Sequence, residues 1–324
     1  MKNRKNILKD QSGIALITVI LIVSILAAAA LELNRSTRHD IYDAANLSDG
    51  IRLTYIAKSG FYGAAALLAK SSADYETLRD DWARAETFSA QSASFFPNGH
   101  FILRIEDEKG KIPLNKLVDG GAVNPEIKEM LLRLLALPEF ELGPQEGMEI
   151  VDSIIDWMDE NDDISGMGAE SSYYASLPLP YKAKNGPLDC IEELLMIKGI
   201  SKEVFAGTSK KPGLIQCVTI YGTGAININT APKPVLRALC AELTEELADR
   251  MDDYRLNPAN DLSYVTWYKN VPGMGGITIK PELVEMVKSN YFTIRSTGMT
   301  EGMQQSINGV VQRSPFKVMS WRLE

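Results

Sequence analysis

The stretch Gly13-Ile14-Ala15-Leu16-Ile17-Thr18-Val19-Ile20-Leu21-Ile22-Val23-Ser24-Ile25-Leu26, which continues through four alanines to Leu31, decides the fold. From Ile14 to Leu31 there are 18 residues without a charged side chain, about the minimum that crosses the hydrocarbon core of a bilayer as a helix. Basic side chains and a single acid precede it, at Lys2, Arg4, Lys5, Lys9 and Asp10. A basic flank of this kind stays cytoplasmic, so the chain after Glu32 is placed outside the cytoplasm.

Three interpretations of this stretch lead to different proteins. An uncleaved signal anchor would keep the whole chain. A secretory signal peptide fits the basic start and the small residues Ala27 to Ala30, and its cleavage would release a soluble protein. In a class III leader the basic peptide ends in a small residue, here Gly13, and the apolar helix survives cleavage as the new N-terminus. The sequence beyond the apolar stretch favours this third interpretation.

The helical pattern continues past Glu32. Apolar or small side chains recur close to the helical repeat, at Ile41, Ala44, Ala45, Ser48, Ile51, Tyr55, Phe61, Ala65 and Leu68. This predicts one long helix from residue 14 to about residue 70, half in lipid and half packed on a globular domain. Gly50, Gly60 and Gly63 weaken this helix and are candidate kink positions.

A basic leader that ends in Gly13, an apolar N-terminal helix and a long amphipathic continuation resemble a type IV pilin-like protein. Pilins carry Glu at the fifth mature position, which is Thr18 here. That Glu is thought to pair with the amino terminus of the subunit already in the filament, and burying it unpaired in lipid is costly. The first subunit of a filament has no such neighbour. Thr18 therefore fits a first subunit, although it equally fits a protein that is not a pilin.

Composition narrows the function further. The formal charge of the 324-residue chain is −8, and loss of residues 1–13, with four bases and one acid, makes it −11. An acidic exported body binds nucleic acid poorly. The three cysteines have no close spacing that indicates a zinc site; one disulfide with a spare thiol and three reduced thiols both remain open. With only two histidines, a histidine-based active site is not expected.

The remaining chain alternates between strand and helix patterns. Phe101, Leu103 and Ile105 alternate with polar or exposed positions, and Ile112 and Leu114 follow a turn at residues 108–110, which predicts a hairpin packed on the long helix. Helices are expected at 125–137, 144–158, 188–198, 202–206, 233–241, 245–254, 263–268 and 281–288, and further strands at 214–221, 225–228, 291–296, 304–312 and 316–322. This order predicts one domain of helix and strand built from both ends of the chain, with a helical domain inserted.

An acidic loop follows the helix predicted to end at Met158. Asp159, Asn161, Asp163 and Glu170 stand at the first, third, fifth and twelfth places of a calcium loop, and Ca²⁺ takes about six to eight oxygen ligands. Ile164 holds the sixth place, where an EF-hand requires Gly. We therefore interpret the segment as a calcium loop that is not an EF-hand; a solvated acidic loop is the alternative.

Two segments, 191–201 and 226–232, look like helix-hairpin-helix turns. In DNA-binding proteins such a turn offers backbone N–H groups to a phosphate. Around the two turns taken together, acidic side chains outnumber basic ones, so compact packing of short helices is the stronger interpretation.

The order and spacing of several weak motifs resemble one family over nearly the whole chain. The motifs are Asp156-Trp157-Met158-Asp159, Gly168-Ala169-Glu170 with Tyr173-Tyr174, Asn185, Glu193-Leu194 and Asn227-Ile228-Asn229-Thr230-Ala231-Pro232. Together they resemble the minor pseudopilin K family of type II secretion. The usual lack of the pilin Glu in that family agrees with Thr18.

This resemblance implies an α+β, type IV pilin-like fold, in which a long N-terminal helix packs on an antiparallel sheet, with a large inserted and mostly helical domain. The implied parts are a prepilin leader at 1–13, a transmembrane part at 14–33, a first pilin-like part at 34–118, an inserted domain with the calcium loop at 119–288 and C-terminal strands at 289–324.

The resemblance also implies a structural subunit and not an enzyme. Prepilin peptidase would cut after Gly13, and Ile14 would be methylated. The subunit would be single-pass in the inner membrane with a periplasmic body, and would cap or initiate the pseudopilus tip with minor pseudopilins I and J. Minor pseudopilin H and the inner-membrane platform are further candidate partners. Calcium would bind at Asp159, Asn161, Asp163 and Glu170, with Asp156 and Asp162 as candidate extra ligands.

Two alternatives of other classes remain open. A membrane-anchored helix-hairpin-helix DNA receptor would account for a single span followed by two hairpin-like turns, and a steep salt dependence of duplex binding would identify it. A periplasmic hydrolase using the acids near residues 156–170 has little support, because no nucleophile and base pair stands out.

Overall fold

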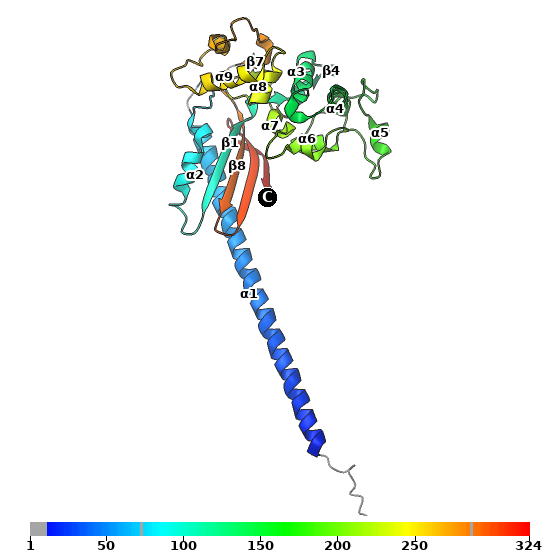
Figure 1. Ribbon diagram of the computed structural model, residues 1–324, viewed down its shortest axis with the longest axis vertical. Coiled ribbons are helices and arrows are strands. Elements are labelled where there is room, and N and C mark those ends of the chain that lie inside the picture. The colour runs from blue at the N-terminus through cyan, green and yellow to red at the C-terminus, as the bar shows by residue number, and fades with distance from the viewer. Residues whose placement is uncertain (1–11, 72–73, 286–287) are drawn as a thin grey trace, which may run out of the picture.

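A computed structural model describes residues 12–71, 74–285 and 288–324. Helix α1 (Ser12–Lys70) is a continuous rod of 59 residues that projects from the globular part (Figure 1), which confirms the predicted long helix. Its residues 13–49 are exposed, and the part that packs on the chain's own core begins at Leu53. The amphipathic region therefore packs on the globular domain over a shorter length than the sequence predicts. The leader, except its last two residues, lies outside the described part.

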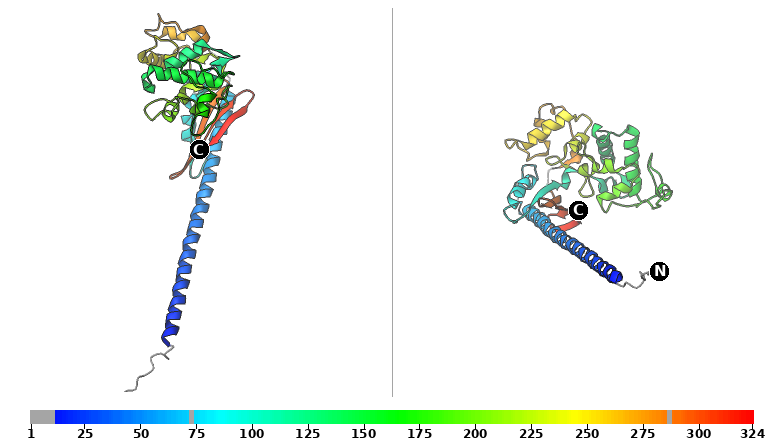
Figure 2. Two further views of the ribbon diagram at one scale, coloured as in Figure 1. Left: turned by 90° about the vertical axis from the view of Figure 1, so that its right-hand side faces the viewer. Right: turned by 60° about the horizontal axis from the view of Figure 1, so that its bottom comes forward.

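The four-stranded antiparallel sheet lies against the upper end of α1 (Figure 2). Its order is β1-β8-β9-β10, formed by β1 (His100–Asp107), β8 (Tyr291–Met299), β9 (Gln304–Gln312) and β10 (Lys317–Leu323). Alternate side chains such as Leu103, Ile294 and Ile307 pack on Phe61 and Leu68 of α1 in one apolar core. The first strand and the last three thus build one sheet, as the alternating patterns at both ends of the chain predict.

Gly60 of α1 explains how closely the helix approaches the sheet. A Cβ atom there would lie 2.2 Å from Ser296 Oγ and 2.9 Å from the Phe101 ring, whereas a Cβ at Gly63 would meet nothing within 4 Å. Gly60 therefore serves close packing, and the helix continues through it without a break.

The predicted hairpin after residue 105 is wrong. Strand β1 pairs with β8, whereas β2 (Ile112–Pro113) pairs in parallel with β5 (Val218–Thr219). A short 3-10 helix, η3 (Glu108–Gly110), carries the chain out of the sheet. Ile112 and Leu114 are fully buried, but in the core of the inserted part and not on α1. The alternating pattern correctly predicted that Ile112 and Leu114 are buried, but it assigned them to the wrong part of the protein.

Residues between the crossover at Asp107 and β8 form a second body with its own core. That core includes Met130, Ile154, Leu236 and Trp267. The elements of this body are η4 (Leu114–Lys116), β3 (Val118–Asp119), β4 (Ala122–Val123), α3 (Pro125–Leu135), η5 (Pro138–Phe140), α4 (Pro144–Met158), α5 (Ser171–Ala175), η6 (Ile191–Met196), α6 (Lys202–Ala206), α7 (Leu214–Cys217), β6 (Ile226–Asn227), α8 (Lys233–Ala238), α9 (Glu245–Leu256), η7 (Val265–Asn270), η8 (Pro281–Leu283) and β7 (Val284–Glu285). Before β1 lie η2 (Asp81–Arg84) and α2 (Glu86–Ser92).

Several predicted elements of this body differ from the observed ones. The strand expected at 214–221 is the short helix α7 followed by β5, because Gln216 Oε1 accepts a hydrogen bond from the Gly213 N–H and so supports a helical turn. The helices expected at 188–198 and 263–268 are the 3-10 helices η6 and η7. The helix expected at 281–288 is η8 followed by β7, and residues 286–287 lie outside the described part. Helices α4 and α6 have the predicted bounds.

Candidate metal centre

Three acidic side chains meet where helix α4 ends. Asp156 lies in the last turn of α4, Asp159 is its C-cap residue, and Glu170 precedes α5. Residues three apart share one face of a helix, so Asp156 and Asp159 point the same way, and the loop returns Glu170 to them. Ligand oxygens of the three carboxylates all lie within 4.8 Å of one another.

The three carboxylates are buried and short of hydrogen-bond donors. Asp156, Asp159 and Glu170 are 0%, 7% and 1% exposed. Asp156 Oδ1 accepts from the Ser165 N–H at 2.9 Å, and Asp159 Oδ1 from the Asn161 N–H at 3.2 Å. Asp156 Oδ2 and both Glu170 oxygens have no hydrogen-bond partner among the described residues. Buried polar atoms without partners are rare and costly, so this cluster needs protons or a cation.

The pKa values of the three carboxyl groups show the same crowding of buried acids. Burial, together with the neighbouring charges of Asp156 and Asp159, raises the pKa of Glu170 to about 7. Burial also raises the pKa values of Asp156 and Asp159. Like charges held together in a poorly solvated place disfavour ionisation. A bound cation would reverse this effect and hold all three carboxylates ionised.

Glycines and fixed contacts close the loop over the cluster. A Cβ at Gly168 would lie 2.1 Å from Asp156 Oδ2, so only glycine permits this approach. The backbone N–H of Met167 donates to Asp152 Oδ2 at 3.1 Å. Lys198 Nζ, which pairs with Glu149 at 2.7 Å, also donates to Met167 O at 3.3 Å. The loop is thus compact, which favours a built site over a merely solvated acidic loop.

The predicted ligands are only partly brought together. Glu170 and Asp159 lie in the cluster with Asp156, which the family resemblance implied as a candidate extra ligand. Asn161 and Asp163 are exposed, and Asn161 Oδ1 accepts from the Asp163 N–H at 2.7 Å. Asp163 is outside the cluster of three. The structure thus gathers two of the four predicted ligands, and the full ligand set stays a prediction.

Asp162 and Asn185 form a second contact beside the cluster. Asn185 Nδ2 donates to Asp162 Oδ1 at 3.2 Å and to Asn161 O at 3.0 Å, while Asn185 Oδ1 is buried without a hydrogen-bond partner among the described residues. Asn185 has a positive φ of 51°, a conformation that Asn tolerates better than most residues. The sequence reasoning did not assign Asn185 to the site; its place before Gly186 in a polar loop was the available signal.

The processing residues lie at the start of α1. Gly13 and Ile14 are helical and exposed, and Thr18 Oγ1 donates back to Ile14 O at 2.9 Å. Among the described residues, α1 is the one helix long and apolar enough to cross a membrane, with a mean hydropathy of 3.0 over its best 18 residues.

The second hairpin-like turn, at residues 226–232, packs inside the protein. Asn227 and Asn229 of the second turn are fully buried. Asn227 Nδ2 donates to Asp107 Oδ2 and to Glu76 O, each at 3.3 Å, and Asn229 Oδ1 accepts from Trp267 Nε1 at 2.7 Å. These side chains hold the core together. The packing interpretation of this turn therefore stands over a phosphate-binding one.

The chain is similar to several proteins of one secretion system. The family model described as "Type II secretion system (T2SS), protein K" matches residues 110–210. Type II secretion system protein K of Aeromonas hydrophila is 26% identical over 248 residues, 72% of this chain and 71% of the relative. Its counterpart in Pseudomonas aeruginosa is 29% identical over 245 residues, 71% and 68% of the two chains.

A solved structure matches over most of the fold. It is a chain of the GspK-GspI-GspJ complex from the enterotoxigenic Escherichia coli type 2 secretion system, with a TM-score of 0.67 and 19% identity over 87% of this chain and 99% of the other. An apolar anchor helix that continues along an antiparallel sheet, with a large inserted body, defines a pilin-like subunit tethered to a membrane by one helix. These matches support type II secretion system protein K, a minor pseudopilin and structural subunit of that system, as the family that this chain resembles.

Proposed function

We propose that this minor pseudopilin caps or initiates the pseudopilus tip, and that its role is mechanical and not catalytic. One observation carries the proposal: the inserted body lies at the end of the molecule opposite the apolar part of α1 (Figure 1). In a filament whose subunits share the direction of α1, this body would occupy the space above the subunit. A further subunit would collide with it, so growth continues only below.

Minor pseudopilins I and J are the proposed partners. The structural neighbour was solved as a complex with GspI and GspJ. Exposed apolar side chains on α1 beyond the lipid part, including Leu47, Ile51 and Tyr55, support packing of partner helices along α1 by burial of apolar surface. Minor pseudopilin H and the inner-membrane platform are proposed as further contacts of the assembled tip.

Anchoring and processing follow the pilin pathway in this proposal. The apolar part of α1 spans the inner membrane once, with the basic leader cytoplasmic and the folded body periplasmic. Prepilin peptidase cuts after Gly13, and Ile14 becomes the methylated N-terminus. The unbroken helix from Ser12 onward supports this, since the apolar segment and the packed segment are one element.

Calcium is the proposed ligand of the candidate metal centre. Carboxylate oxygens are the donors that Ca²⁺ prefers, and three of the oxygens in the cluster are buried without another partner. The ion would be held by Asp156, Asp159 and Glu170, and would supply the positive charge that keeps them ionised. Backbone carbonyls and water would complete the six to eight ligands that calcium takes. Folding of the loop onto α4 is the expected result.

Localisation of the subunit on assembled pseudopili tests the tip proposal. The chain would carry an epitope in an exposed loop and be produced with the remaining pseudopilins, and gold-labelled antibody would be counted along sheared filaments. A tip subunit gives at most one label, at a filament end. The same epitope on the major pseudopilin is the control and should label the shaft. Labels of the minor subunit spread along the shaft would refute a cap.

A further inference from the structure

The two edge strands of the four-stranded sheet, β1 and β10, differ in whether another element covers their outward backbone groups. Strand β1 is covered by α2, whose serines replace a neighbouring strand. Ser92 Oγ accepts from the Phe101 N–H at 3.0 Å and donates to Phe101 O at 3.1 Å, and Ser89 Oγ accepts from the Leu103 N–H at 2.8 Å. Three outward backbone groups of β1, both of Phe101 and the N–H of Leu103, are thereby satisfied. Among the described residues only β9 pairs with β10, so β10 is the open edge.

The backbone groups that β10 offers can be assigned. Ser306 and Glu324 exchange both N–H···O bonds, at 2.9 and 2.8 Å. Antiparallel pairs alternate between bonded and non-bonded positions, so Trp321 and Leu323 turn their N–H and C=O groups away from β9. Their side chains are 41% and 46% exposed. An apolar edge strand with free backbone groups is a template for strand addition.

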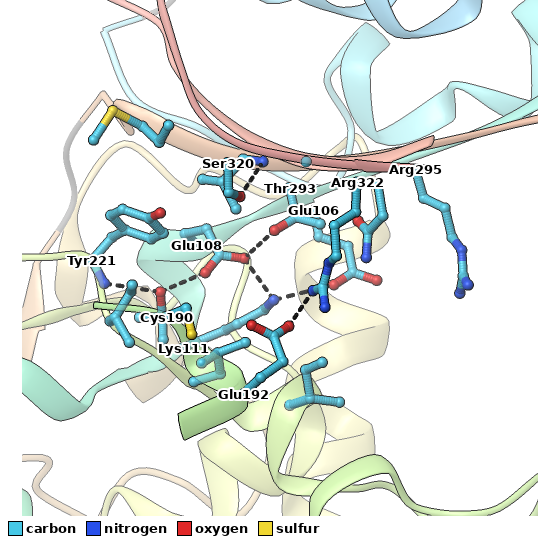
Figure 3. Close-up of a pocket in the computed structure, with 18 of the residues that line it drawn as sticks. Glu106, Glu108, Lys111, Cys190, Glu192, Tyr221, Thr293, Arg295, Ser320 and Arg322 are labelled. Carbon is cyan, nitrogen blue, oxygen red and sulfur yellow. Dashed lines mark hydrogen bonds and ion pairs between the residues drawn. The ribbon is translucent and has the colours of Figure 1, made fainter. Parts of the chain in front are cut away.

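The two faces beside this edge differ in chemistry. On the α1 side, Lys58 Nζ lies 5.5 Å from the centre of the Trp321 ring and 5.4 Å from that of Tyr55. The edge is therefore continuous with the exposed apolar surface of α1. On the opposite side a cleft of about 590 Å³ lies between the sheet and the inserted body, and Arg322 and Arg295 line it (Figure 3).

We propose that β10 accepts an extended strand of another pilin-like subunit anchored in the same membrane. The side chains of that strand alternate, apolar toward Trp321 and Tyr55 and acidic toward Arg322 and Arg295. This inference rests on the proposed function, which places two such subunits beside α1. Acidic side chains fit because Arg322 and Arg295 are both more than half exposed, although they pair with Glu192 and Glu324.

A second copy of this chain does not fit the edge. A twofold pairing of β10 with β10 runs the two strands antiparallel. The strands of the sheet and α1 lie along roughly the same axis (Figures 1 and 2). Antiparallel pairing of two β10 strands would therefore point the apolar segments of the two α1 helices to opposite sides. Both could not enter one membrane. The occupant is therefore a different subunit whose own anchor points the same way.

Amide hydrogen exchange of the full chain in detergent, alone and co-purified with minor pseudopilins I and J, tests the inference. The Trp321 and Leu323 amides should exchange at least about tenfold more slowly in the complex, since each gains a hydrogen bond there. The Arg322 amide faces β9 and should be slow in both samples. If the complex forms and the 321 and 323 amides exchange as in the isolated chain, the strand inference is overturned while the proposed function stands. If neither subunit co-purifies, both fail.

A matched pair of variants gives an independent readout. Leu323→Pro removes an outward N–H without taking a bond from β9, a position where a strand tolerates proline, while Leu323→Ala removes the side chain and keeps the N–H. In co-purification with minor pseudopilins I and J, we expect the proline variant to retain at least about fivefold less of the subunit that covers β10 than the alanine variant retains. Equal retention by the two variants contradicts strand addition. Because proline keeps more apolar side-chain surface than alanine, loss of apolar contact alone would favour the proline variant and cannot produce the difference.

Discussion

Removing one charge from the acidic cluster should change stability in opposite directions with and without calcium. In Glu170→Gln the side chain keeps its size and loses its charge. Without calcium at pH 7.5 the variant should be more stable than the parent chain, because it no longer confines three negative charges. The rise of the Glu170 pKa from 4.5 to about 7 corresponds to roughly 3 kcal/mol at about 1.4 kcal/mol per unit. This is an upper limit, since a buried amide also lacks partners.

Calcium should stabilise the parent chain and not the variant. A site with a dissociation constant of roughly 10⁻⁴ to 10⁻³ M stabilises the folded state by about 1.4 to 2.7 kcal/mol at about 10 mM calcium. Urea unfolding of the full chain in detergent, with calcium or with a chelator, measures both effects. Glu160→Gln is the control, because Glu160 is an exposed acid of the same loop. The reasoning is refuted if calcium stabilises Glu170→Gln as much as it stabilises the parent chain.

Three further predictions use positions elsewhere in the fold. Gly60→Ala should destabilise the chain by about 1 to 3 kcal/mol, because the added methyl group overpacks against Ser296 and the Phe101 ring. Gly63→Ala meets nothing within 4 Å and should stabilise α1 by about 0.5 to 1 kcal/mol. Urea unfolding of both variants measures the two effects, and equal effects would contradict this prediction. Glu76 forms a buried ion pair with Arg313 at 2.6 Å. Glu76→Gln leaves Arg313 without a countercharge and should lower the free energy of unfolding by about 3 to 5 kcal/mol. A smaller decrease than that of Gly60→Ala would count against a native ion pair. Brief maleimide labelling of the folded chain should modify Cys190, the exposed thiol, before the other two; peptide mass mapping that finds them labelled first would disagree.

The sequence predicted the elements at both ends of the chain because their patterns depend on local burial. An apolar helix of this length has few alternatives in water or lipid, and strands β8 and β9 alternate buried side chains with more exposed ones. Which strand pairs with which was harder to predict. Strand β1 finds its partner β8 far along the chain, so the next apolar residues, Ile112 and Leu114, looked like its hairpin partner.

In the candidate metal centre, too, the sequence did not predict which residues come together, although they lie close along the chain. Counting along a calcium-loop pattern selected Asp159 and Glu170 but also Asn161 and Asp163, which stay outside the cluster. The helix at 144–158 was predicted with its observed bounds. Helical spacing alone would then have placed Asp156 beside Asp159, one turn earlier than a loop motif begins. What the sequence could not supply is the path of the loop, which depends on contacts such as Lys198 to Met167.

A cap must stay in a fixed position relative to its shaft, and the junction between the two bodies is built for this. Asp107, at the end of β1, is buried where the chain leaves the sheet. Its Oδ2 accepts from Thr230 Oγ1 at 2.7 Å and from Ser289 Oγ at 2.8 Å, so one carboxylate at the end of β1 holds the inserted body and the segment that leads back into β8. Burial raises the pKa of Asp107, and these donors oppose that rise by favouring the ionised form.

A second polar contact lies beside this crossover. Glu108 accepts from Lys111 Nζ and from Thr293 Oγ1 of β8, each at 2.7 Å, and also bonds Thr219 of β5. Two buried carboxylates that each bridge both bodies resist hinge motion more than apolar contact would, because opening the junction would leave their oxygens unpaired. Force on the inserted body would therefore pass into the sheet and α1 instead of bending the junction, which suits the proposed cap at a filament tip.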